Sequence, residues 1–287
     1  MKRLERVFAR CRAEKRKALV LYLTAGDPDL DTSRRLLLAA AAAGADIIEI
    51  GMPWSDPSAD GLAIQAAMQR ALAAGGGLSS SLEICRAVRA ENDDVGLVLF
   101  GYANPIFVTG IDRFAERAQL AGADALLCVD WPPDEAPELR AALAKRELGF
   151  VPLLTPTSTP PRIAVATSAA RGFIYYVSMT GITGVKLNDL EGPRAHVAQI
   201  RAAMGGAAAQ PGGSSSSPTA ASAPSSPIVV GFGITSPADA RAVAEFADGV
   251  VVGSAAVRVV EQAVGAGTDP TAALGAFVKS LAAALKS

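Results

Sequence analysis

The sequence has little of the chemistry that most metal and nucleophile sites require. His196 is the only histidine among 287 residues. The three cysteines, Cys11, Cys85 and Cys128, are far apart and form neither a metal-ligand spacing nor a disulfide framework. A histidine-based triad and a zinc site are therefore nearly excluded, and we interpret His196 as an ordinary helix-surface residue. The cysteine usage fits a reducing cytosol.

An excess of one charge and a long apolar run are also missing. Lys and Arg number 27 against 28 Asp and Glu, so nothing indicates binding to nucleic acid or to an anionic membrane. The longest apolar run, residues 36–43, is too short to span a bilayer. The basic N-terminus is interrupted by charges, unlike a signal peptide, and its apolar spacing predicts a helix within residues 1–15. We expect a cytoplasmic protein.

What the sequence does contain is a repeated strand-and-helix pattern. Short, largely continuous apolar runs are typical of strands buried on both faces. Eight of them alternate with helical segments such as 33–44, 111–122 and 236–247, which predicts a single (β/α)8 TIM-barrel domain over residues 1–287. A doubly wound open sheet is the alternative. The predicted strands are 18–23, 46–50, 96–100, 125–129, 150–154, 173–177, 227–230 and 249–253.

Three of the turns into strands are alike, and one segment breaks the pattern. Asp46, Asp124 and Asp248 each lie just before a strand, which supports one repeated unit. Residues 205–227 are almost entirely Gly, Ala, Ser, Pro and Thr. Such a composition cannot offset its ordering entropy by burial, so we predict a flexible loop between a helix and the strand 227–230. That is the end of the barrel opposite the chemistry.

Two carboxylates, Glu49 and Asp60, are the first candidates for chemistry. Glu49 ends a predicted strand, and alternation places it with Ile47 inside the barrel, where desolvation should raise its pKa so that it can shuttle a proton. A structural carboxylate paired with a lysine or arginine is the alternative. Asp60 ends the following loop and could instead cap the helical run after Gly61.

Glycine turns are the second candidate site. Gly231 and Gly233 follow the strand 227–230, and Gly253 and Ser254 end the last strand. Backbone amides at these two places form the usual phosphate site of such barrels, although tight packing turns remain the alternative. The stretch 179–189 contains two glycines and two threonines and is predicted to be a mobile lid. Its Gly184 could reach the same phosphate, and Thr183 belongs to it.

These segments together resemble the tryptophan synthase α subunit over nearly the whole chain. The SDPxADG stretch with its upstream glutamate is highly specific, and the other motifs match in order and spacing. The motifs are LYLTAGDPD (21–29), IEIGMPWSDPSADG (48–61), GYANPIF (101–107), FIYYVSMTGITG (173–184), GFGI (231–234) and DGVVVGS (248–254).

The resemblance implies a (β/α)8 barrel that cleaves indole-3-glycerol phosphate to indole and glyceraldehyde 3-phosphate by a retro-aldol reaction, without a metal or cofactor. It implies that Glu49 is the acid/base, that Asp60 holds the indole N–H, and that Tyr175 belongs to the site. It further assigns the phosphate to Gly184, Gly231, Gly233, Gly253 and Ser254, and the indole pocket to Tyr22, Phe100, Leu127 and Val251.

The resemblance also implies a partner, a pyridoxal-phosphate β subunit in an α2β2 heterotetramer that receives the indole. The matched contacts are Pro53, Asp56, Asn104, Pro105, Phe107, Asp130 and Pro132. Trp54, Trp131 and Met179 depart from the family pattern, which affects contact detail and lid closure more than chemistry. A non-catalytic regulatory subunit, a stand-alone indole-releasing lyase and a related barrel with another phosphorylated substrate are the alternatives.

Overall fold

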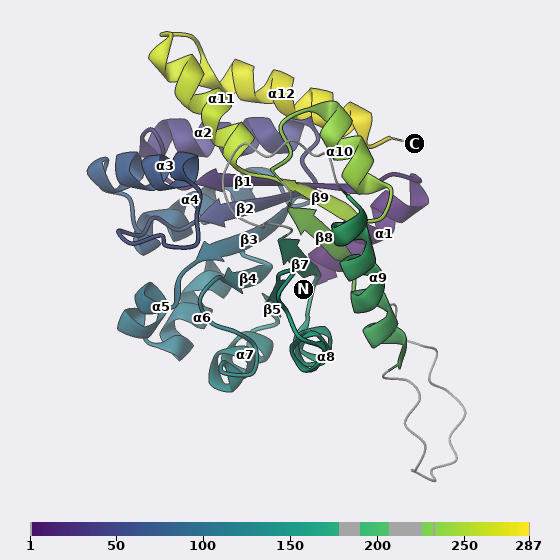
Figure 1. Cartoon of the computed structure of the whole chain (residues 1–287). Coiled ribbons are helices and arrows are strands. Elements are labelled where there is room, and N and C mark those ends of the chain that lie inside the picture. Colours follow the sequence, from purple (N-terminus) through teal and green to yellow (C-terminus); the bar gives the residue numbers. More distant parts are fainter. Residues whose placement is uncertain (1, 178–189, 207–225, 232, 287) are drawn as a thin grey trace.

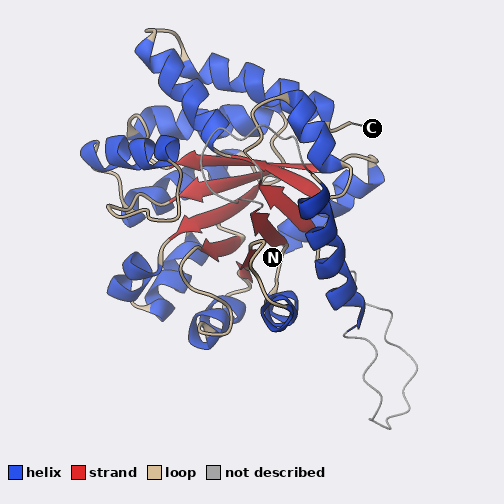
Figure 2. Cartoon of the chain, viewed as in Figure 1, coloured by secondary structure: helices blue, strands red, loops and turns tan. Residues whose placement is uncertain are grey.

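The computed structural model describes residues 2–177, 190–206, 226–231 and 233–286. In these ranges, nine parallel strands form one curled sheet with helices around it (Figures 1 and 2). The strands are β1 (Ala18–Thr24), β2 (Ile47–Gly51), β3 (Gly96–Gly101), β4 (Ala125–Cys128), β5 (Gly149–Phe150), β6 (Leu153–Leu154), β7 (Ile174–Val177), β8 (Ile228–Gly231) and β9 (Gly249–Val252).

The sheet closes into a barrel through the short stretch 149–154. Its order is β5-β4-β3-β2-β1-β9-β8-β7-β6, so β5 and β6 are the two ends and are adjacent in the chain. Val151 donates its N–H to Leu126 at 2.9 Å, and Pro152 accepts from Tyr175 at 3.0 Å. Pro152 has no N–H to donate, which accounts for the predicted strand at 150–154 appearing as two pieces. Counted as one strand, they complete the predicted (β/α)8 barrel, which is confirmed.

Helices cover the outside of the barrel and one of its ends. The first helix, α1, carries Leu4, Val7 and Phe8 into the barrel interior at the end opposite α3 (Figure 1). The helices are α1 (Lys2–Ala13), α2 (Leu30–Ala43), α3 (Leu62–Ala73), α4 (Leu78–Glu91), α5 (Ala103–Thr109), α6 (Ile111–Leu120), α7 (Pro137–Lys145), α8 (Pro160–Ala169), α9 (Glu191–Gly206), α10 (Pro237–Ala244), α11 (Ser254–Gly265) and α12 (Pro270–Ala284).

Strand alternation separates two buried clusters, as the sequence predicts. Ile47 belongs to the cluster inside the barrel. Ile48 and Ile50 belong to the cluster between the strands and the outer helices. Glu49 pairs in register with Tyr22 on β1, a member of the inner cluster. The side chain of Glu49 therefore points into the barrel at the end where the strands finish.

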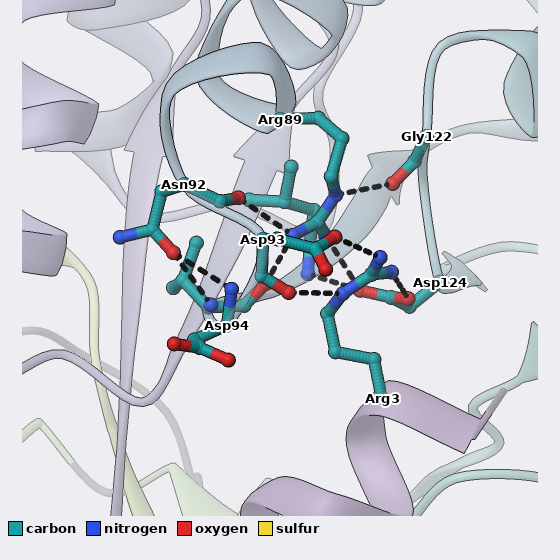
Figure 3. Close-up of polar contacts among 9 residues, drawn as sticks. Arg3, Arg89, Asn92, Asp93, Asp94, Gly122 and Asp124 are labelled. Atoms are coloured by element: carbon teal, nitrogen blue, oxygen red, sulfur yellow. Dashed lines mark hydrogen bonds and ion pairs between the residues drawn. The ribbon is translucent and has the colours of Figure 1, made fainter.

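The aspartate before β4 joins two strands and two arginines. The side chain of Asp124 is 2% exposed and accepts the N–H of Leu97 on β3 at 2.8 Å. Arg89 donates to the same carboxylate at 2.8 Å, and Arg3 of α1 donates to its other oxygen (Figure 3). Arg3 also reaches the exposed Asp93 at 2.7 Å. This cluster holds α1 against β3 and β4 at the end of the barrel that α1 covers.

The same arrangement recurs at the two other joints. Asp46 accepts the N–H of Leu19 at 3.0 Å and pairs with Arg16. Asp248 accepts the N–H of Ile228 at 2.9 Å and pairs with Arg201. The turn that repeats in the sequence therefore makes the same hydrogen bond each time. The aspartate before one strand accepts a backbone N–H from the strand that precedes it in the chain.

Replacing Asp124 should be strongly destabilising. Asp124→Ala leaves Arg89 without its carboxylate partner and the Leu97 N–H without its side-chain acceptor, and removing one partner of a buried pair costs about 3–5 kcal/mol. Asp93→Ala removes the ion pair between Arg3 and the Asp93 carboxylate. Because that carboxylate is 78% exposed, the change should affect stability little. Urea denaturation of both variants measures the difference. Equal, small effects would show that the Asp124 cluster does not hold the strands.

The predicted lid at 179–189 and most of the predicted loop at 205–227 lie outside the described residues.

Candidate active site

Glu49 is a buried carboxyl group without a partner. It is fully buried on β2, and within the described part of the chain neither of its oxygens has a hydrogen-bond partner. Burial, together with the charge of Asp60, raises the pKa of Glu49 to about 8. A pairing with a described lysine or arginine is thereby ruled out. Because such groups are rare in folded proteins, this one calls for a functional explanation.

Asp60 lies at the end of the loop that leads from β2 to α3. The N-cap of α3 is Gly61, so the interpretation of Asp60 as a helix cap is wrong. Its carboxylate instead accepts a hydrogen bond from the Tyr102 hydroxyl at 2.6 Å. Burial raises the pKa of Asp60 to about 6, and the hydrogen bond from Tyr102 acts in the opposite direction.

These two values make the carboxyls unequal at neutral pH. With a pKa of about 8, Glu49 is mostly protonated and can donate a proton. With a pKa of about 6, Asp60 is mostly ionised and can hold a cationic group. When two carboxyl groups of one site have pKa values that differ in this way, one can act as the acid and the other as the anion.

Tyr102 is the site residue that the sequence analysis missed. It follows β3, is 3% exposed, and touches Asp60 through its hydroxyl. The signal was present, because Tyr102 comes two residues after the inward-facing Phe100 and alternation gives both the same side. Tyr102 lies in the motif GYANPIF, in which the family resemblance implies roles only for Asn104, Pro105 and Phe107.

The predicted indole pocket falls in an apolar cluster that adjoins the two carboxyls. The residues predicted to line it belong to one cluster inside the barrel, and Tyr22 and Phe100 meet edge to face with their ring centroids 5.1 Å apart. Tyr175 is buried on β7, and the nearby charges of Glu49 and Asp60 add to burial in raising its pKa. The structure thus brings together Tyr22, Phe100, Leu127, Tyr175 and Val251.

The glycine turns lie at the same end of the barrel. Gly231 ends β8 in register with Val251 on β9, and a Cβ there would lie 2.6 Å from the Tyr175 hydroxyl. Gly253 is the N-cap of α11, and Ser254 is its first residue. The free N–H groups of this helix start can bind an anion.

Three other residues are predicted to contact the phosphate or close over it. Gly233 is exposed with a φ of +55°. Gly184 and Thr183 lie outside the described residues.

One arginine ties together the elements around the site. Arg70, near the end of α3, donates to both oxygens of Asp27, at 2.7 and 3.0 Å. It also donates to Glu261 of α11 at 2.7 Å. The helix after Asp60, the loop after β1 and the helix with the glycine turn are therefore linked.

The residues predicted to contact a partner surround the same end. Phe107 is 57% exposed and stacks on Trp131 with ring centroids 4.3 Å apart. Asp130 is exposed and accepts the N–H of Ala103 at 2.8 Å. Of the others, Asn104 and Asp56 are exposed, Pro105 and Pro132 are partly exposed, and Pro53 is buried.

The raised pKa values predict how stability depends on pH. Ordinary values are 4.5 for Glu and 3.8 for Asp, so between about pH 5 and 8 the folded chain holds more protons than the unfolded chain. The free energy of unfolding should therefore fall as pH rises through this range. Denaturant titrations of the wild type and Glu49→Gln test this, because the variant should lose most of the decline above pH 6. An identical decline would contradict the raised pKa of Glu49.

The described residues contain neither a metal-binding cluster nor a membrane-spanning helix. Among the described residues, no group of three or more His, Cys, Asp or Glu side chains could hold a metal ion. No helix in the described ranges is long and apolar enough to cross a membrane.

Known proteins resemble the chain along almost all of its length. The family model described as tryptophan synthase alpha chain matches residues 8–286. The tryptophan synthase alpha chain of Citrifermentans bemidjiense is 45% identical over 281 residues, covering 98% of this chain and 97% of that protein. That of Geotalea daltonii is 44% identical over 262 residues, covering 91% of each.

Solved structures agree with these matches. The tryptophan synthase subunit alpha of Legionella pneumophila superposes with a TM-score of 0.86 at 35% identity, covering 99% of this chain and 98% of that one. A chain from the Mycobacterium tuberculosis tryptophan synthase structure gives 0.84 at 34% identity, with 99% and 98% covered.

Proposed function

The chain belongs to the tryptophan synthase alpha chain family, and from this premise we propose that it is a carbon–carbon lyase in which Glu49 and Asp60 carry the chemistry. As a member of this family it catalyses the alpha reaction of tryptophan biosynthesis and has no cofactor of its own, since the pyridoxal phosphate belongs to the β subunit. The reaction is the retro-aldol cleavage of indole-3-glycerol phosphate to indole and glyceraldehyde 3-phosphate.

Glu49 moves the proton in this proposal. Cleavage needs a proton on indole C3, so that the aromatic carbon can leave. Protonated Glu49 donates it, and the resulting carboxylate accepts the proton of the substrate hydroxyl as the C–C bond breaks and the aldehyde forms. The observation that carries the proposal is the pair of buried Glu49 oxygens without a partner among the described residues.

Asp60 stabilises the charge that the proton creates. Protonation of C3 makes the indole nitrogen cationic, and an ionised carboxylate within hydrogen-bond reach of the N–H lowers the energy of that state. The apolar pocket of Tyr22, Phe100, Leu127 and Val251 would hold the ring, with Tyr175 beside it. Gly231, Gly233, Gly253 and Ser254 would bind the phosphate, together with Gly184, and Thr183 would belong to the lid.

The partner is the β subunit that the family implies. We propose that it contacts the exposed Phe107 and Asn104 of α5, Asp130, Asp56 and the adjoining Pro53, Pro105 and Pro132. We further propose a heterotetramer of two copies of each chain and a cytoplasmic location, with no role for nucleic acid or a membrane.

Indole release from indole-3-glycerol phosphate, assayed with and without a β subunit, tests the function. We expect one glyceraldehyde 3-phosphate per indole, slow release by the chain alone and faster release with β. No indole under either condition would leave only a regulatory role. Full activity without β would indicate a stand-alone lyase.

A further inference from the structure

The Tyr102 hydroxyl connects the loop of residues 53–60 to the next strand of the barrel. It donates to the Asp60 carboxylate at 2.6 Å and accepts the N–H of Ala59 at 3.2 Å. The other hydrogen bonds of this loop among the described residues stay within the loop or reach Gln65 of α3. One phenol oxygen thus holds both the backbone and the carboxylate at the end of the loop.

The surroundings of Asp60 make this contact important for its charge. The titratable groups whose charges act with Asp60 are Glu49 on β2, Tyr22 on β1, Tyr175 on β7 and Tyr102 itself. None of these is a cation. The hydrogen bond from Tyr102 therefore opposes the burial that favours the protonated carboxyl.

We propose that Tyr102 is a positioning residue that fixes the orientation of Asp60 and keeps it ionised, while holding the loop 53–60 against the barrel. The inference rests on the proposed function, because it assumes that ionised Asp60 faces the indole nitrogen. Tyr102 is not required to touch the substrate. Its effect on the reaction passes through Asp60.

Tyr102→Phe removes the hydroxyl and keeps the ring. If Asp60 must be ionised, the acid side of the profile of kcat/KM against pH reports its pKa. Losing the hydrogen bond should move that side to higher pH by about one unit, since a hydrogen bond to a charged group is of that size. With the Asp60 pKa rising from about 6 to about 7, the loss of activity should be about fivefold at pH 6, approach tenfold below about pH 5 and be small near pH 8. Hydrogen exchange at the Ala59 amide should also become faster.

Tyr176 on β7 provides a matched control. Tyr176 is buried, and its hydroxyl has no hydrogen-bond partner in the described residues. It belongs to the outer cluster, on the opposite side of β7 from Tyr175. Tyr176→Phe should leave the pH profile unchanged, which separates the loss of this particular hydroxyl from the loss of any buried one.

A double variant distinguishes positioning from general support of the fold. Once Asp60→Ala has removed the acceptor, adding Tyr102→Phe should change kcat/KM by less than twofold, because the two residues act as a pair. Coinciding pH profiles of Tyr102→Phe and the wild type would overturn the inference, as would additive effects in the double variant. If the wild type releases no indole, the proposed function fails instead.

Discussion

Glu49→Gln should lose more than about 99% of indole release while the protein stays folded, because general acid–base catalysis is typically worth 10²- to 10⁴-fold. Glutamine has the size of glutamate but cannot give its proton to indole C3 or take one from the substrate hydroxyl. The buried position should accept it readily, since Glu49 forms no ion pair or hydrogen bond with a described residue. Steady-state assays with saturating substrate measure the loss in kcat.

The control for this variant is Glu91→Gln. Glu91 is an exposed residue at the end of α4 that pairs only with Arg34 in the described structure, and its replacement should leave turnover unchanged. Circular dichroism and thermal unfolding should show that Glu49→Gln is folded. Near-normal indole release by a folded Glu49→Gln protein would mean that another group carries the proton.

Asp60→Asn should lose about 10²- to 10³-fold in kcat, the range found when one group that stabilises developing charge is removed. The amide can still accept the indole N–H but carries no negative charge for the cationic ring. Since the charge of Asp60 contributes to the raised pKa of Glu49, the variant should also show a lower pKa for Glu49. The basic side of its residual pH profile should therefore move to lower pH.

Asp94→Asn is the matched control for this second variant. Asp94 is exposed before β3, at the end of the barrel opposite the site. It should have wild-type kinetics. A loss in Asp60→Asn that appears only in KM, with kcat unchanged, would assign Asp60 to substrate binding and remove its proposed role in the chemical step.

Local patterns were enough to predict the barrel and the main candidates. Continuous apolar runs marked all eight strands because both faces of each strand are buried. Alternation along β2 placed Glu49 inside the barrel, and the predicted helical segment 236–247 contains α10, which begins with a capping box of Ser236 and Asp239. These features depend on neighbours close in the sequence.

Contacts between distant segments could not be predicted in the same way. The three aspartates before strands were recognised as a repeat, but their arginines were not, because Arg3 and Asp124 are 121 residues apart. The tie between Tyr102 and Asp60 was missed for the same reason, since 42 residues separate them. The break at Pro152 depends on whether a neighbouring strand needs an N–H at that position, which the run of apolar residues does not reveal.

The most direct test of the proton role is cleavage of indole-3-glycerol phosphate in D2O by the wild-type chain with its β subunit, with β inactivated so that indole accumulates. Any acid that exchanges with solvent places one deuterium at C3 of each indole, so the measurement compares the rate of this deuteration in the wild type and in Glu49→Gln. If Glu49 delivers the proton, the wild type should form C3-deuterated indole with an equal amount of glyceraldehyde 3-phosphate, and Glu49→Gln should form it more than about 100-fold more slowly. Mass spectrometry of indole quenched early gives both rates. Equal rates in the two proteins, or no indole from the wild type, would contradict the account.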